Sequence, residues 1–122
     1  ADRTEFLGFV PEADLPSLYA GSDAFLFLSR YEGFGLTFLE SMASATPVIG
    51  TAVGGFPDIV TSGQDGFVVD REPGDVAAAV ERLVDAPERL AEMRTEARST
   101  AEARTWETVA AETEQVYESV VE

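Results

Sequence analysis

The sequence predicts an α/β fold: a parallel sheet of about four strands flanked by helices, followed by a helical C-terminal third. Two observations predict it. Over the first two thirds of the 122 residues, short apolar runs alternate with segments of helical periodicity, and the last third is helical throughout. The apolar runs are nearly continuous, which is typical of strands buried on both faces of a parallel sheet. The predicted strands are residues 6–10, 25–28, 48–50 and 67–69.

Helices are predicted between and after these strands. Residues 14–20 carry Pro16 in the first turn, where proline is tolerated, and residues 36–44 follow a glycine-containing loop. A short helix over 57–61 and three longer helices, beginning near residues 75, 88 and 106, complete the pattern. In the last helix, apolar residues such as Val116, Tyr117 and Val120 recur at spacings of three and four. We expect that stripe to dock on an apolar surface.

The chain is strongly acidic. It has 23 Asp and Glu residues against eight basic residues, all of them Arg, and its formal net charge is −15. Such a surface repels nucleic acids and anionic lipids. The excess of acid and the absence of Lys indicate a halophilic protein, whose surface charge needs salt for screening.

The residue types that are missing exclude several kinds of chemistry. The sequence contains no Cys and no His, which excludes disulfides, thiolate nucleophiles, Cys/His zinc sites and histidine acid–base catalysis. No apolar run approaches the roughly 20 residues that span a membrane. We therefore expect a cytoplasmic protein without a transmembrane segment.

The candidate binding site is the loop that joins the second predicted strand to the following helix. In parallel α/β sheets, ligands bind beyond the carboxyl ends of the strands, where helix N-termini also point. Residues 29–35 read Ser-Arg-Tyr-Glu-Gly-Phe-Gly. The two glycines let a ligand approach backbone N–H groups at the positive end of the helix dipole. The loop is therefore a candidate anion cradle; the alternative is a plain strand-to-helix turn.

Two carboxylates accompany this loop, Glu32 before the helix and Glu40 within it. A carboxylate is repelled by phosphate and can only accept hydrogen bonds, so its natural partners are the hydroxyls of a sugar or ribose. The alternatives are that Glu32 is only a favourable charge before a helix N-terminus, and that Glu40 is an ordinary surface side chain.

Residues 29–43 closely resemble the E-x7-E signature of retaining GT-B glycosyltransferases of the group 1, or family 4, type, with Glu32 and Glu40 at its two acidic positions. The similarity extends in the family's order over roughly residues 5–85, through blocks such as 46–49 and 53–57. The resemblance implies a Rossmann-like nucleotide-sugar-binding fold. It matches the later part of the C-terminal domain of the family's enzymes.

The resemblance also implies a reaction and a role for each residue of the signature. The reaction is transfer of a sugar from a nucleotide sugar to an acceptor with retention at the anomeric carbon, without a cofactor or a metal. Glu32, the implied catalytic residue, would contact the hydroxyls of the donor sugar, and Glu40 would hold the nucleotide ribose. Backbone N–H groups of the glycine loop would bind sugar and phosphate. The implied donor-binding residues are Glu32, Gly33, Phe34, Gly35, Leu36, Thr37 and Glu40.

The sequence departs from the family pattern at two positions. Ala45 stands where the family usually has Gly at a helix end, and Asp58 stands where Glu usually follows the Gly-Gly-x-Pro turn. These departures put in doubt a local helix cap and one contact in the cleft.

The larger departure is what the chain lacks relative to the family. The acceptor-binding domain is absent, as are two strands that would separate residues 6–10 from residues 25–28. We therefore expect a single, incomplete domain over 1–122, with an α/β part at 1–86 and C-terminal helices at 87–122, inactive on its own. Strand 6–10 is expected either to pair beside 25–28 through a right-handed crossover, or to form a homodimer by edge pairing with a second copy.

Two other functions are open. One is a non-catalytic nucleotide-sugar-binding or regulatory module, built on the same fold without an acceptor domain. The other is a glycoside hydrolase that uses Glu32 and Glu40, which needs the two carboxyls about 5 or 6.5–9.5 Å apart across one bond. It would leave the glycine cradle without a purpose. The sequence does not name the sugar, the base or the acceptor.

Overall fold

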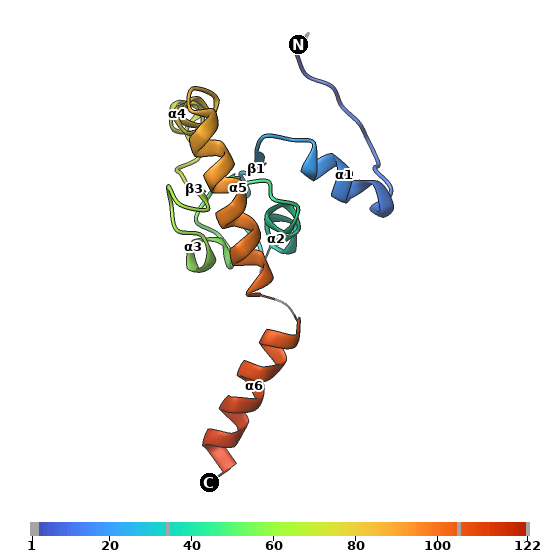
Figure 1. Ribbon diagram of the computed structural model, residues 1–122, viewed down its shortest axis with the longest axis vertical. Coiled ribbons are helices and arrows are strands. Elements are labelled where there is room, and N and C mark those ends of the chain that lie inside the picture. Colours follow the sequence, from blue (N-terminus) through green and yellow to red (C-terminus); the bar gives the residue numbers. More distant parts are fainter. Residues whose placement is uncertain (1–2, 34, 105, 122) are drawn as a thin grey trace.

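The computed structural model describes residues 3–33, 35–104 and 106–121 of the chain. Its centre is a parallel sheet of three short strands, in the order β1 (Phe25–Phe27), β2 (Val48–Gly50) and β3 (Gly66–Val68) (Figure 1). Phe27 lies opposite Gly50, and Gly50 lies opposite Val68. The predicted parallel α/β fold is confirmed, and each of these strands lies within one residue of its predicted position.

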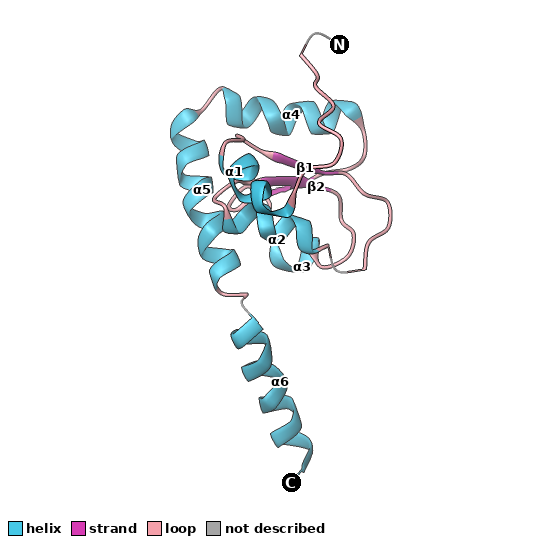
Figure 2. Cartoon of the chain, turned by 90° about the vertical axis from the view of Figure 1, so that its right-hand side faces the viewer, coloured by secondary structure: helices cyan, strands magenta, loops and turns pink. Residues whose placement is uncertain are grey.

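Helices cover both faces of the sheet. In Figure 2, α4 runs along one side of the strands, and α2 and α3 lie on the other side. A 3₁₀ turn at Glu12–Asp14 precedes the first helix. The helices are α1 (Leu15–Ala20), α2 (Leu36–Ala43), α3 (Phe56–Ile59), α4 (Pro73–Val84), α5 (Pro87–Glu102) and α6 (Trp106–Val121).

An apolar core lies on each face of the sheet, and the two cores meet in β2. Val48 and Ile49 are both fully buried, Val48 in the core under α2 and α3 and Ile49 in the core under α4. Successive residues of a strand point to opposite faces, so a strand between two cores is apolar at every position. Helix α5 contributes to both cores, with Met93 on the α4 side and Ala97 on the α2 side.

Residues 6–10, the first predicted strand, do not join the sheet. Phe6 is 94% exposed and Phe9 is 90% exposed. Between them Gly8 has a φ of +67°, which takes the backbone out of the extended conformation. A strand gains its ladder hydrogen bonds only from a neighbouring strand, and the outer edge of β1 has none in the part of the chain that the structure describes. The described sheet therefore has three strands instead of about four, and the predicted crossover pairing is wrong. Pairing with a second copy stays a prediction.

The last helix, α6, points away from the sheet and the other helices (Figures 1 and 2). The side chains of Val116, Tyr117 and Val120 are 63%, 68% and 77% exposed. These three residues of the apolar stripe that was expected to dock on a surface therefore face solvent.

The end of α2 forms a well-defined cap although it lacks the usual glycine. Ala45 has a φ of +60°, its N–H donates to the Met42 carbonyl at 2.9 Å, and the Thr46 N–H donates to the Ser41 carbonyl at 3.0 Å. These two bonds are the Schellman pattern, in which glycine is favoured at the left-handed position. Arg94 of α5 adds a hydrogen bond of 3.0 Å to the Ala45 carbonyl. The local cap that the substitution put in doubt therefore forms.

Candidate functional site

The loop over residues 29–35 lies at the carboxyl end of the sheet, beside the loop that follows β2. The two loops are joined by a hydrogen bond of 2.6 Å from the Thr51 hydroxyl to the Ser29 carbonyl. The Thr51 N–H also donates to the Phe27 carbonyl at 3.0 Å, which continues the pairing of β1 with β2 by one residue. The loop therefore starts from a fixed point on the sheet.

Gly35 is required at its position both by conformation and by space. It precedes α2 with a φ of 95° and a ψ of 57°, in the left-handed region that favours glycine. A Cβ placed there would lie 2.7 Å from Cζ of Phe27 and 3.2 Å from Cδ2 of Phe38. The rings of Phe27, Phe38 and Phe56 pack together with centroids 5.1–5.7 Å apart. The end of the loop is thus seated directly on an aromatic cluster of the core.

The N-terminus of α2 has no side-chain cap, because glycine supplies none. Leu36 and Thr37, the first two residues of the helix, are exposed, and the Leu36 side chain is 55% exposed. Free N–H groups in the first turn of a helix attract an anion. The helix end at which the anion cradle was predicted therefore lies at the surface without a side-chain cap.

Gly33 differs from Gly35 in that neither its backbone conformation nor its neighbours among the described residues require a glycine there. It is exposed and its φ is not positive, and apart from its two chain neighbours no atom of the described residues lies within 4 Å of the position that a Cβ would take. Phe34, which was also predicted to donate its backbone N–H, lies outside the described residues.

The carboxylate of Glu32 is exposed and held by one hydrogen bond. The Ser29 hydroxyl donates to Oε1 of Glu32 at 2.9 Å. No hydrogen bond from the described residues engages Oε2, so this oxygen and the second lone pair of Oε1 can accept from a ligand.

Glu40 lies on the exposed side of α2, one helical turn after Leu36 and Thr37. Residues Phe38, Ser41 and Met42 make the buried side of the helix. Burial and, to a smaller extent, the negative charge of Glu40 raise the pKa of the Tyr19 phenol above its ordinary value. Both acidic side chains of the predicted site are thus on the surface, Glu32 before the helix and Glu40 within it.

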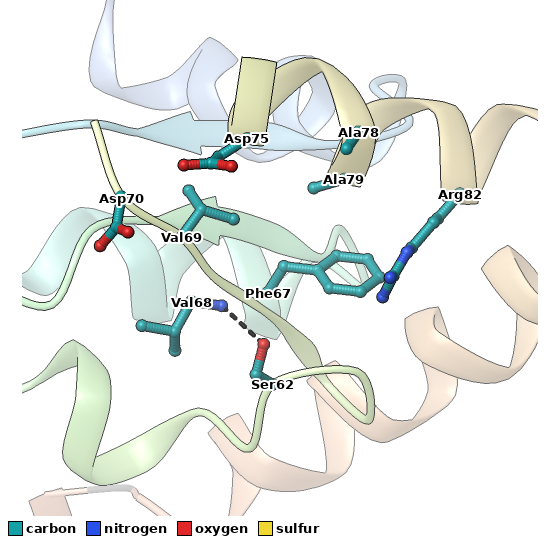
Figure 3. A pocket seen from close by; sticks show the side chains of 9 residues that line it. All are labelled: Ser62, Phe67, Val68, Val69, Asp70, Asp75, Ala78, Ala79 and Arg82. Carbon is teal, nitrogen blue, oxygen red and sulfur yellow. Dashed lines mark hydrogen bonds between the residues drawn. The ribbon is translucent and has the colours of Figure 1, made fainter. Parts of the chain in front are cut away.

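A cavity of about 350 Å³ lies elsewhere, between β3 and α4 (Figure 3). Asp70 and Asp75 lie toward one end of it and Arg82 lies beside the ring of Phe67, while the Val68 N–H donates to the Ser62 hydroxyl at 3.0 Å. Since β3 and β1 are at opposite edges of the sheet, this cavity is separate from the site at 29–40.

The described residues contain neither a metal-binding cluster nor a membrane-spanning helix. In ranges 3–33, 35–104 and 106–121, no three His, Cys, Asp or Glu side chains are grouped so that they could hold a metal ion. None of the helices in those ranges has the length and apolar character needed to cross a membrane.

Sequence reasoning did not assign a role to Ser29 or Thr51. The bond between Ser29 and Glu32 joins residues three apart in the sequence, and the Ser-x-x-Glu spacing, which is also that of a capping box, is a signal for such a local contact. The bond from Thr51 to Ser29 could not be predicted in this way, because it depends on how the loops after β1 and β2 lie against each other.

The chain matches the family model described as "Glycosyl transferases group 1" over residues 1–100. It is 37% identical over 123 residues to D-inositol 3-phosphate glycosyltransferase 2 of Catenulispora acidiphila, and this match covers 100% of the chain and 29% of that protein. It is 47% identical over 73 residues to the O-antigen chain mannosyltransferase B of Escherichia coli, covering 60% of the chain and 18% of that protein. The chain thus spans less than a third of the length of these curated relatives.

Solved structures agree with the sequence matches. Sucrose-phosphate synthase from Thermosynechococcus elongatus superposes with a TM-score of 0.82 at 30% identity, over 98% of this chain and 31% of that chain. Anabaena HepE in complex with UDP and glucose gives a TM-score of 0.78 at 27% identity, over 98% of this chain and 32% of that chain. The C-terminal domain of a group 1 glycosyl transferase from Francisella tularensis gives 0.71 at 28% identity, over 81% of this chain and 52% of that chain. The family model covers well over half of the sequence and the fold match covers nearly all of it, so the chain belongs to the group 1 glycosyltransferases and corresponds to the C-terminal domain of their GT-B fold.

Proposed function

We propose that this chain supplies the donor-binding residues of a retaining glycosyltransferase that transfers a sugar from a nucleotide sugar to an acceptor. The observation that carries the proposal is that the family match spans the loop and helix in which the structure has an exposed glycine, an uncapped helix N-terminus and two exposed carboxylates. The proposed donor-binding residues are Glu32, Gly33, Phe34, Gly35, Leu36, Thr37 and Glu40.

The chemistry of these groups suits the parts of a nucleotide sugar. When the bond between the anomeric carbon and the diphosphate breaks, negative charge develops on the leaving phosphate oxygen. The N–H groups at the start of α2, next to Leu36 and Thr37, stabilise that charge. The free oxygen of Glu32 accepts hydrogen bonds from the sugar hydroxyls, and Glu40 accepts from the ribose hydroxyls.

The ligands bound to one structural neighbour suggest which donors to try first. HepE was solved with UDP, with UDP and glucose, and with UDP-glucose. We propose that this chain also takes a nucleoside diphosphate sugar, and UDP-glucose is the first donor to test. A cofactor and a metal are not part of the proposal, so a chelator is expected to leave transfer unchanged.

The acceptor-binding residues are expected in a part of the GT-B fold other than the one that this chain matches. We therefore propose that the chain alone is inactive in transfer and that the polypeptide encoded by the complete reading frame is active. A non-catalytic nucleotide-sugar-binding module is the alternative, and it predicts donor binding without transfer by that polypeptide.

The test measures donor affinity and transfer by the complete polypeptide, its Glu32→Gln and Glu40→Gln variants, and a matched Glu81→Gln control, since Glu81 is an exposed glutamate on α4. We expect kcat/KM for the donor to fall at least tenfold in the first two variants and to stay unchanged in the control. Unchanged donor affinity and rate in both site variants would refute the assigned roles. An α-linked product from an α-linked donor establishes retention.

A further inference from the structure

We infer that Thr51 is a positioning residue for Glu32, and that it acts through Ser29 without touching the substrate. This inference rests on the proposed function, because it concerns the carboxylate assigned to the donor sugar. It starts from two consecutive hydrogen bonds: the Thr51 hydroxyl donates to the Ser29 carbonyl at 2.6 Å, and the Ser29 hydroxyl donates to Oε1 of Glu32 at 2.9 Å.

The first bond joins a rigid part of the chain to an exposed loop. Thr51 directly follows β2 and is 5% exposed, and its N–H donates to the Phe27 carbonyl at 3.0 Å. A hydroxyl carries one proton. Its oxygen lies 2.6 Å from the Ser29 carbonyl but 3.4 Å from that of Phe27, so the proton belongs to the bond with Ser29. Thr51 thereby fixes the backbone at the start of the loop.

The second bond transmits that fixed position to the carboxylate. Ser29 is partly buried, whereas Glu32 is exposed and has no other hydrogen bond among the described residues. An exposed glutamate side chain otherwise samples many rotamers, and holding it in one lowers the entropy that a ligand must overcome. Because Oε1 is used only in part and Oε2 is free, Ser29 orients Glu32 without blocking it.

The two bonds predict which step of donor recognition depends on Thr51. Glu32 is assigned to the sugar and not to the nucleotide. Loss of the Thr51 hydroxyl should therefore weaken the binding of the nucleotide sugar and leave the binding of the free nucleotide unchanged. If Thr51 had a purely structural role, its substitution would weaken the binding of both ligands or of neither. One neutral hydrogen bond corresponds to a change of up to about tenfold in affinity.

The experiment uses the complete polypeptide, with UDP-glucose and UDP as probes. Thr51→Val removes the hydroxyl, Thr51→Ser keeps it, and Ser29→Ala removes the second bond. The matched control is Thr46→Val, because Thr46 is fully buried at the other end of β2 and its hydroxyl donates to the Tyr19 carbonyl, away from the loop. Dissociation constants are measured well below the unfolding midpoint of every variant.

We expect Thr51→Val and Ser29→Ala to lower the affinity for UDP-glucose about tenfold without changing the affinity for UDP. The affinity of Thr51→Ser for UDP-glucose should stay within about twofold of that of the unchanged protein. Thr46→Val should be less stable, but it should not lower the affinity for UDP-glucose relative to that for UDP. In a Glu32→Ala background, Thr51→Val should have no further effect, since the carboxylate that it positions is gone. Nitrogen-15 relaxation of the ligand-free protein should show greater mobility at the Glu32 and Gly33 amides in Thr51→Val but not in Thr46→Val.

Two failures are distinguishable. In the first case, Glu32→Ala lowers the affinity for UDP-glucose, but Thr51→Val changes the affinity for neither probe or lowers both equally. The positioning role is then wrong and the proposed function stands. If Glu32→Ala has no effect on any nucleotide sugar in a donor panel, the proposed function is wrong and the positioning role has lost its basis. Unchanged loop mobility in Thr51→Val also overturns the inference, whatever the ligand.

Discussion

The two glycines of the candidate site should respond in opposite ways to a single added methyl group. Gly33 and Gly35 are two residues apart in one loop, and both are proposed to contact the donor. We predict that Gly35→Ala destabilises the fold, whereas Gly33→Ala leaves the fold intact and weakens donor binding.

The loss of stability expected for Gly35→Ala follows from the backbone conformation of Gly35 and from its neighbours. Alanine in the left-handed region, with φ at 95°, costs about 1–2 kcal/mol. The new Cβ also lies 2.7 Å from Cζ of Phe27 and 3.2 Å from Cδ2 of Phe38, and displacing well-packed rings costs about 1–3 kcal/mol. The combined loss of about 2–5 kcal/mol is a large part of the 5–15 kcal/mol that stabilises a typical domain.

The expectation for Gly33→Ala differs because the site is open. The φ of Gly33 is not positive, and apart from its two chain neighbours a Cβ would meet no atom of the described part of the chain within 4 Å. The substitution should change the free energy of unfolding by no more than about 0.5–1 kcal/mol, and restriction of the unfolded chain favours a small gain. In the complete polypeptide the methyl group would occupy the space proposed for the donor, so kcat/KM should fall at least tenfold.

Urea denaturation of both variants, together with donor affinity measured by calorimetry, tests the pair. A stable Gly35→Ala variant would refute the account of the loop as seated on the aromatic cluster. A Gly33→Ala variant with unchanged stability and unchanged donor affinity would refute the placement of the donor against residue 33.

Three further predictions concern the cap, the pH dependence and the charge. Ala45→Gly should raise the free energy of unfolding by about 1 kcal/mol, because Ala45 occupies a left-handed position with a φ of 60°; an unchanged urea midpoint would contradict this. Burial first, and the charge of Glu40 second, raise the pKa of Tyr19 in the folded state. The stability that this shift contributes is complete below the unfolded pKa of about 10 and is lost as the pH rises through the higher folded pKa, and Tyr19→Phe should remove this part of the alkaline decline in thermal midpoint. With a net charge of −15, self-repulsion should make folding depend on salt. The thermal midpoint of unfolding should rise steeply as KCl is raised to molar concentration. A thermal midpoint that is the same in dilute buffer would count against haloadaptation.

The elements best predicted from the sequence are those whose environment is local or symmetric. The strand at 48–50 was found because burial on both faces makes every position apolar. The strand at 25–27 is also apolar throughout, although Leu26 is 48% exposed, and α2 was found from its glycine-led start. The same criterion failed for residues 6–10, since an apolar run needs a neighbouring strand and none of the described strands lies beside it. Periodicity identified α6 but could not show whether Val116, Tyr117 and Val120 have a partner.

The candidate site was predictable in its residues but not in its internal bonds. Glu32, Gly35 and Glu40 were selected from spacing and residue type, and the structure puts the loop and the helix at the carboxyl end of the sheet as expected. The hydrogen bond from Thr51 to Ser29 joins segments 22 residues apart. Contacts of this kind depend on tertiary structure, which a pattern along one chain does not contain.

Helix α5 has a consequence for how this chain unfolds. Met93 is 1% exposed in the core under α4, and Ala97 is fully buried in the core under α2. A single turn of α5 therefore packs into both cores. Neither face of the sheet can lose its cover without opening the other, so the strands and the helices α2 to α5 should melt in a single cooperative transition. A polypeptide ending before Pro87 would leave both faces of the sheet without this cover, whereas one ending after Glu102 would keep it.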